Sequence, residues 1–236
     1  MEAVRAQTKT LTGRSFYLGM MVTITALILF GFSHTVGTDV LHPAEAPPTI
    51  LYVHVITYTA WLGVLLTQTL LVWLRNPRLH RKFGMLGAFF ALFMIVLGIA
   101  TTIVMGRFQV ARHGLAAGMF IFRPFEDVLF FATAFGLAVY WRKKPDFHRR
   151  LMLLAACAVT PPAISRIPMI HSLGAVYVIT DILILAGLFN DIVTRRKVHQ
   201  VYLWGLPIVV TGQGLLLYIM QAQPPVALAF ARFVTQ

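Results

Sequence analysis

Seven apolar runs dominate the sequence, each of the length that an α-helix needs to cross a lipid bilayer, which is about 20 residues. Hydrophobic residues make up 58% of the 236 residues and the mean hydropathy is +0.76. That is more apolar surface than one water-soluble core can bury. The sequence therefore predicts an all-α integral membrane protein in contact with the lipid bilayer. Its seven transmembrane helices are predicted near 16–33, 49–74, 84–106, 124–141, 151–170, 172–193 and 201–221.

Basic residues are concentrated at alternate ends of the predicted helices. Fifteen of the 20 lysine and arginine residues fall in the N-terminal segment and in the bends after the second, fourth and sixth helices. By the positive-inside rule, we expect a multi-pass protein of the bacterial inner membrane with a cytoplasmic N-terminus and its C-terminus outside. Topology and attraction to anionic lipid account for the net charge of +12, so no nucleic-acid partner is predicted.

One block of sequence occurs twice, 68 residues apart, at the bends that follow the second and fourth predicted helices. Hairpins duplicated in the same orientation are related by a pseudo-twofold axis along the membrane normal. We therefore expect a single transmembrane domain, residues 1–236, whose duplicated two-hairpin core (helices two to five, 49–170) is flanked by 16–33, 172–193 and 201–221. The identical positions include Trp73 and Trp141, Pro77 and Pro145, His80 and His148, and Arg81 and Arg149.

The repeat places His80 and His148 at the same depth on symmetry-related helices. Two imidazoles that face each other across such an axis can coordinate a six-coordinate heme iron. The alternative is that each histidine begins a helix at the headgroup level, where the basic triplet binds lipid phosphate. The basic residues available to neutralise heme propionates are Arg81, Lys82, Arg149 and Arg150.

Polar side chains follow one face of the second predicted helix. His54, Tyr58 and Gln68 are spaced by three or four residues, or near multiples of that spacing. A stripe of this kind faces protein or a cofactor and not lipid. For Tyr58 and Gln68, hydrogen bonding between helices is the favoured interpretation.

Four ionisable residues fall in the outer halves of predicted helices: His54, Asp127, Arg166 and Asp181. Because such groups are costly when they face lipid, we expect them to converge. Two interpretations are open: an ion pair of Arg166 with Asp127 or Asp181, or a site for a quinone head group, a proton or a metal. The residues that offer ligands for a non-heme metal ion are His54, Glu126, Asp127, His113 and His171.

The fifth predicted helix contains two adjacent prolines, Pro161 and Pro162. A proline inside a helix removes a backbone hydrogen bond and kinks the chain. We therefore expect the outer half of this helix to be kinked and to form a cavity wall.

Together these motifs resemble an uncharacterised family of predicted bacterial seven-helix membrane proteins. That family is similar to the diheme cytochrome b proteins that carry electrons across membranes. The resemblance implies that His80 and His148 hold an inner heme b and that His54 is half of an outer pair. The fourth predicted helix has no histidine, so His113 would have to reach in from the loop or the outer heme is absent. The residues that carry the resemblance are His54, Gln68, Arg75, His80, Arg81, Gly84, 147–152 and Arg166.

Three functions remain open. The leading hypothesis is a b-type redox protein that transfers one electron through a heme, with a quinone or metal site in the outer leaflet. The second is a non-catalytic subunit or assembly factor that works with other membrane subunits. The third is a small-molecule transporter, which the duplicated hairpins and the kinked helix favour, although the first copy has no matching prolines.

Overall fold

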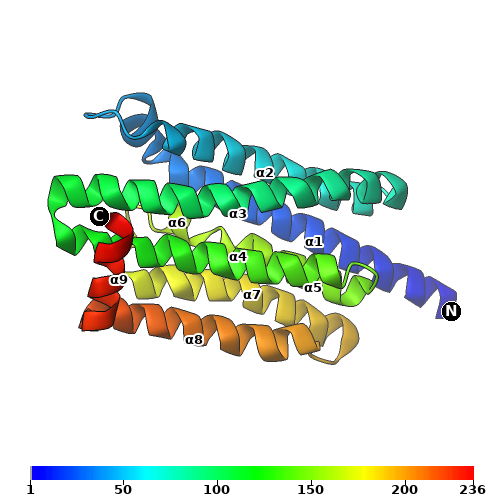
Figure 1. Cartoon of the computed structure of the whole chain (residues 1–236). Helices are drawn as coiled ribbons and strands as arrows, with labels where there is room; N and C mark the ends of the chain where they lie inside the picture. The colour runs from blue at the N-terminus through cyan, green and yellow to red at the C-terminus, as the bar shows by residue number, and fades with distance from the viewer. Residues whose placement is uncertain (1) are drawn as a thin grey trace.

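The computed structural model describes residues 2–236, with side chains for 13–114 and 118–236. Every regular element in this part of the chain is helical (Figure 1). The long helices are α1 (Glu2–Ser33), α2 (Thr49–Trp73), α3 (Pro77–His113), α4 (Phe122–Tyr140), α5 (Pro145–Ala158), α7 (Leu173–Arg195) and α8 (Gln200–Ala222). The short ones are the π-helix η1 (Gly37–Leu41), the 3-10 helix η2 (Leu115–Ile121), α6 (Pro161–Ile164) and α9 (Pro225–Thr235).

Five helices of the described chain are long and apolar enough to cross a membrane. They are the Gly13–Ser33 portion of α1 and the whole of α2, α3, α7 and α8. A helix of about 20 apolar residues matches the thickness of the hydrocarbon core. The chain is therefore an all-α, multi-pass membrane protein whose apolar helices contact lipid.

The other two predicted spans have a different character. The segment predicted at 124–141 is α4, which begins two residues earlier and carries three charged residues in its first turns. The segment predicted at 151–170 is broken, because α5 ends at Ala158 and only one further turn, α6, follows. Thr160 Oγ1 donates to the Cys157 carbonyl (2.8 Å), which satisfies one acceptor near the break. The kink expected from the two prolines is thus an interruption of the helix.

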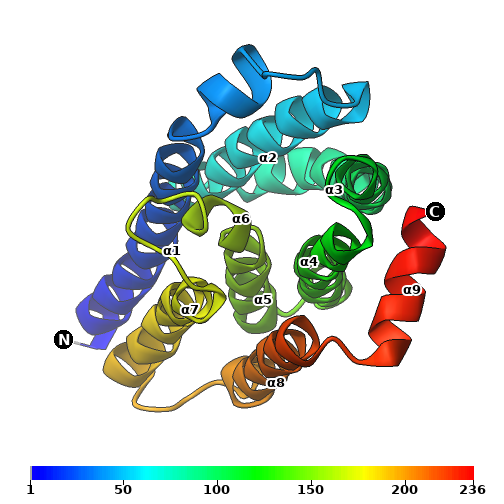
Figure 2. The same cartoon turned by 90° about the vertical axis from the view of Figure 1, so that its left-hand side faces the viewer.

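The helices surround α5 (Figure 2). Helices α1, α4, α7 and α8 all contact it, and the α2–α3 pair closes the ring between α1 and α4. Between Leu151 and Ala158 every α5 side chain except that of Met152 is buried. A helix that is apolar all round lies in a protein core or spans a membrane, and the burial of these side chains places α5 in the core of the bundle.

The two bends of the repeat have similar local structure. After Trp73 and after Tyr140 the chain makes a short bend, and the next helix begins at Pro77 or Pro145. Proline suits the first helical position because the missing N–H would have no partner there. In the first bend, Asn76 also caps α3 by accepting from the backbone N–H of Leu79 (3.2 Å).

The N-terminus and the three basic bends lie at one end of the bundle, on the right of Figure 1. We call this the basic end. At the opposite end, α9 lies across the bundle and packs on η2 and α3 (Figures 1 and 2). Its Ala227 and Ala231 are buried with Met119 and Ile121. Sequence analysis did not predict α9, because a short helix after the last long apolar run has no spanning signal.

Candidate functional site

The two histidines of the repeat lie next to each other toward the basic end. His80 stands near the start of α3 and His148 near the start of α5, each three residues after the first proline of its helix. Their ring centres are 6.2 Å apart and the ring planes cross at 75°. The fold therefore brings together the two residues that the repeat singled out as heme ligands.

Hydrogen bonds to neighbouring helices orient both rings. Nδ1 of His148 donates to the carbonyl of Ala138 in α4 (2.8 Å). Gln68 of α2 places its amide nitrogen 3.0 Å from the His80 carbonyl and 2.7 Å from His80 Nδ1, and its amide oxygen accepts from the N–H of Gly84 (3.2 Å). Because the Gly84 N–H fixes the amide oxygen, Gln68 turns its amide nitrogen to His80 Nδ1, which accepts, and the ring proton of a neutral His80 then lies on Nε2.

The separation of the two rings can be compared with that of two imidazoles bound to one metal ion. With a nitrogen–metal bond of about 2 Å on each side, and each nitrogen about 1 Å from its ring centre, the ring centres lie roughly 6 Å apart. The observed separation is 6.2 Å. A carbonyl acceptor at the other ring nitrogen, as Ala138 supplies for His148, is the usual support of a metal-bound imidazole. Two imidazoles are donors of the kind that a heme iron takes, and the same separation also occurs in edge-to-face contacts between rings that hold no metal.

Two of the expected propionate partners lie close to the histidines in sequence and remain near the surface. Arg81 is exposed, and its Nε donates to the Pro77 carbonyl (3.3 Å). Arg149 pairs with Asp146, and its guanidinium lies 5.6 Å from the centre of the Tyr17 ring. The Nε of Arg149 is buried without a partner in the described part of the chain, so its N–H could donate to a bound group.

Arg150 has a different role from the one expected. Its side chain is fully buried, and it forms a forked ion pair with Asp191 of α7, which is 1% exposed. Nε donates to Asp191 Oδ2 (2.7 Å), Nη2 donates to Oδ1, and Nη1 donates to the Asp146 carbonyl (2.6 Å). Arg150 is therefore not free to neutralise a propionate. The sequence signal was the presence of Asp191, one of few acidic residues near the basic end, which we did not connect with Arg150.

His54 and Tyr58, predicted on one face of α2, stack on each other with ring centres 3.9 Å apart. The hydroxyl of Tyr58 donates to the Met94 carbonyl of α3 (3.1 Å). This approach requires Gly98, because a Cβ there would lie 2.5 Å from the Tyr58 hydroxyl. Nδ1 of His54 is buried and has no partner among the described atoms. Tyr58 thus joins two helices, and His54 keeps an unused ring nitrogen.

Glu126 and Asp181 each accept a hydrogen bond from a neutral side chain on another helix. Tyr177 donates to Glu126 (2.5 Å), which joins α7 to α4. Gln213 donates to Asp181 (3.0 Å), which joins α8 to α7. Asp127 follows Glu126 in α4 and is half-buried. Sequence analysis missed Tyr177 and Gln213, since neutral polar residues in apolar runs give no distinct signal.

Arg166 bonds to neutral groups at the break after α6. Its Nε donates to Thr35 Oγ1 (3.1 Å), its Nη1 donates to the Pro162 carbonyl (2.6 Å), and its guanidinium lies 4.6 Å from the centre of the Phe32 ring. Within the described side chains it forms no ion pair with Asp127 or Asp181. The expected pairing is therefore replaced by a contact that ties the interrupted segment to α1 and the loop after it.

The residues proposed as ligands of a non-heme metal do not form a coordination set. In the described residues no group of three or more His, Cys, Asp or Glu side chains lies close enough to hold a metal ion. His113 ends α3 and His171 precedes α7, and both are exposed. The outer metal site therefore remains a prediction from sequence.

Comparison of the chain with protein-family models, with curated proteins and with solved structures finds no match. The site itself consists of two adjacent imidazoles, a carbonyl that accepts from one ring and an amide that contacts the other, with arginines at the same end of the bundle.

Proposed function

We propose that this protein is a membrane-embedded b-type cytochrome, with His80 and His148 as the axial ligands of one heme. The observation that carries the proposal is the 6.2 Å separation of their ring centres across two helices distant in sequence. A heme held by His80 and His148 would supply one-electron transfer.

Each surrounding residue has a defined part in this proposal. The Ala138 carbonyl accepts from His148 Nδ1, which leaves the opposite ring nitrogen, Nε2, to face the heme. Gln68 orients His80 from α2. Arg149, with its unpartnered Nε, and Arg81 supply positive charge for the propionates. Heme, when bound, supplies reversible one-electron chemistry, and positive charge nearby favours its reduced form.

The proposal also includes the number of spans, the duplicated core and the orientation in the membrane that the sequence predicts. We propose seven spans, in which α4 and the α5–α6 unit cross together with the five long apolar helices. The 19 residues of α4 extend about 28 Å, close to the hydrocarbon thickness. The α2–α3 and α4–α5 hairpins form the duplicated core. The shared position of the N-terminus and the basic bends supports a cytoplasmic basic end in a bacterial inner membrane.

An absorption spectrum tests the proposal. The protein, expressed with ample heme and purified in detergent, should show a Soret band close to one heme per chain. The double variant His80→Ala/His148→Ala should lose the band, because both axial ligands are gone. His113→Ala is the matched control and should keep it, since His113 is exposed at the far end of α3. A wild-type protein without a Soret band contradicts the proposal and favours the non-catalytic subunit, whereas an unchanged band in the double variant rejects His80 and His148 as the ligands.

A further inference from the structure

Helix α9 lies across the end of the bundle opposite the basic end and carries two apolar faces (Figures 1 and 2). One face packs on η2 and α3, where its Ala227 and Ala231 are buried. We call the other the uncovered face, because no described side chain lies over it. It consists of Val226, Phe230 and Phe233, which are 81%, 46% and 84% exposed. Spacings of four and three residues place these side chains on one side of the helix.

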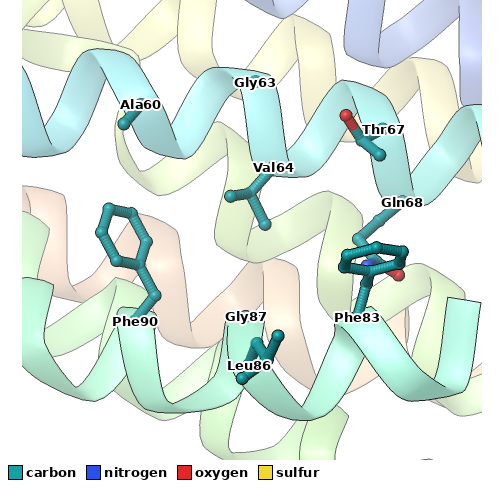
Figure 3. A pocket seen from close by; sticks show the side chains of 9 residues that line it. All are labelled: Ala60, Gly63, Val64, Thr67, Gln68, Phe83, Leu86, Gly87 and Phe90. Atoms are coloured by element: carbon teal, nitrogen blue, oxygen red, sulfur yellow. The ribbon is translucent and has the colours of Figure 1, made fainter.

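The sequence of α3 indicates the depth at which α9 lies. The 24 residues from Phe83 to Gly106 include no Asp, Glu, Lys or Arg and extend about 36 Å, enough to cross a hydrocarbon core of about 30 Å with some tilt. The first part of this stretch lines an open, mainly apolar groove of about 470 Å³ between α2 and α3 (Figure 3). Lys82 marks one boundary of the uncharged stretch and Arg107 marks the other. The Nε of Arg107 donates to the Val234 carbonyl (3.3 Å), so α9 is attached at this second boundary.

The end of α8 indicates the same depth. This membrane span has 23 residues, none of them charged, and α9 begins at Pro225 after a link of only two residues. Tyr218, near the end of α8, is exposed, and tyrosine is common where a span reaches the lipid headgroups. The chain therefore reaches the membrane surface at the end of α8 and continues along that surface as α9.

We propose that α9 is an interfacial helix whose uncovered face inserts into the leaflet at this end of the bundle. Amphipathic helices at a membrane surface bury their apolar face about 5–10 Å into the region between headgroups and acyl chains. Arg232, exposed in the last turn of α9, then lies with Arg107 at the level of the lipid phosphates. Lipid is the occupant that the fold favours, because α8, whose apolar surface contacts lipid, ends two residues before α9 begins.

Spin labels in proteoliposomes of phosphatidylcholine and phosphatidylglycerol measure the depth of α9. A nitroxide is attached to Phe233→Cys in one sample and to Val226→Cys in another. The native Cys157 is buried, so the wild type should stay unlabelled. Collisions with oxygen, which concentrates in lipid, are compared with collisions with a water-soluble nickel chelate. Both labels should favour oxygen and lie about 5–10 Å below the phosphates.

Three further labels calibrate the measurement. Val96→Cys, exposed near the middle of the uncharged stretch of α3, should give the greatest depth. Ala44→Cys, exposed in the loop between η1 and α2, should collide freely with the chelate. Arg232→Cys is the matched control on α9 itself, and it should collide with the chelate more often than its neighbour Phe233→Cys. Equal collision of the chelate with the labels at 44 and 233 overturns the proposal.

A second copy of the chain is the other occupant that could cover this face. It would bring two Phe233→Cys labels together, so that the spectrum broadens and sharpens again when unlabelled protein is added. That result, with few collisions by either reagent, overturns the proposal and indicates a contact between copies. The depth of the labels should be the same with and without bound heme, because no residue of the histidine pair takes part. Loss of the cytochrome proposal therefore leaves this inference standing, and the reverse also holds.

Discussion

Arg150 of α5 and Asp191 of α7 form an ion pair with almost no exposure to solvent, 0% and 1% respectively. Removing one member leaves a buried charge without its partner, which costs roughly 3–5 kcal/mol. Asp191→Asn should therefore lower the free energy of unfolding by that order. The double variant Arg150→Met/Asp191→Leu should recover most of the loss, because apolar residues of similar volume remove both charges.

Denaturation in detergent measures both effects. Arg195→Ala serves as the comparison, because its ion pair with Asp146 is exposed and should contribute no more than about 1 kcal/mol. Equal losses in Asp191→Asn and Arg195→Ala would show that burial does not set the strength of the pair.

Gly187 lets the Tyr202 hydroxyl of α8 pack directly against α7. A Cβ at this position would collide with that hydroxyl and with Leu153 Cδ2 at 2.6 Å. Gly187→Ala should therefore destabilise the fold by roughly 1–3 kcal/mol, the usual cost of overpacking. Adding Tyr202→Phe removes the colliding oxygen and should restore part of the stability. Gly174→Ala, which meets nothing within 4 Å, is the control, and a similar loss there would argue against the close contact.

The Tyr177 hydroxyl and the Glu126 carboxyl couple α7 to α4 through one hydrogen bond of 2.5 Å. Tyr177→Phe leaves the half-buried carboxyl without this donor, so we expect a loss of roughly 1–3 kcal/mol in the free energy of unfolding. In a double-mutant cycle with Glu126→Leu, the two losses should not add. Strict additivity would mean that the two side chains do not interact.

Asp146 makes stability depend on pH at the basic end. The hydrogen bond from Arg195, with the positive charges of Arg149 and Arg150, holds the pKa of Asp146 below its usual range. The pKa of Asp146 is lower in the folded protein than in the unfolded chain, where it is about 3.9. The carboxylate therefore contributes stability above that pH, and the contribution is lost as the pH falls through the pKa of the folded protein. Asp146→Asn should therefore lose less stability than the wild type between about pH 5 and pH 2.

Urea unfolding at a series of pH values measures this difference. The effect should be small, because the Asp146 side chain is 51% exposed and solvent screens its charge. Parallel pH curves for the wild type and Asp146→Asn would rule out this role.

The limits of the apolar helices were predicted closely where a proline or a cluster of basic residues lies next to the apolar run. The predicted 49–74 is α2 (Thr49–Trp73), and the predicted 201–221 is α8 (Gln200–Ala222). Proline before α2 and a basic bend after it mark the limits. Two helices extend beyond the predicted spans, because hydropathy registers only apolar residues. α1 begins at Glu2, although its spanning portion Gly13–Ser33 agrees with the predicted 16–33, and α3 covers Pro77–His113 where 84–106 was predicted.

The candidate site was predicted in part. The repeat pointed to His80 and His148, and they meet in the structure. Their supporting contacts were not predictable, because the Ala138 carbonyl is a backbone group and any helical residue has one. Arg150 was grouped with Lys82 as a partner for heme propionates because the repeat aligns the two positions, but the structure buries Arg150 and exposes Lys82.

The sequence by itself determined that the chain is a bundle of apolar helices, where the strongest spans begin and end, and that two histidines stand at equivalent bends. These properties are local, because they follow from runs of residue types and from prolines at helix starts. The tertiary structure decided which helix lies in the centre. Because α5 is enclosed by its neighbours, the buried Arg150 is paired with Asp191, whereas Lys82 on the peripheral α3 is exposed. Two residues at matching positions of a repeat thus differ because burial depends on what packs around each helix.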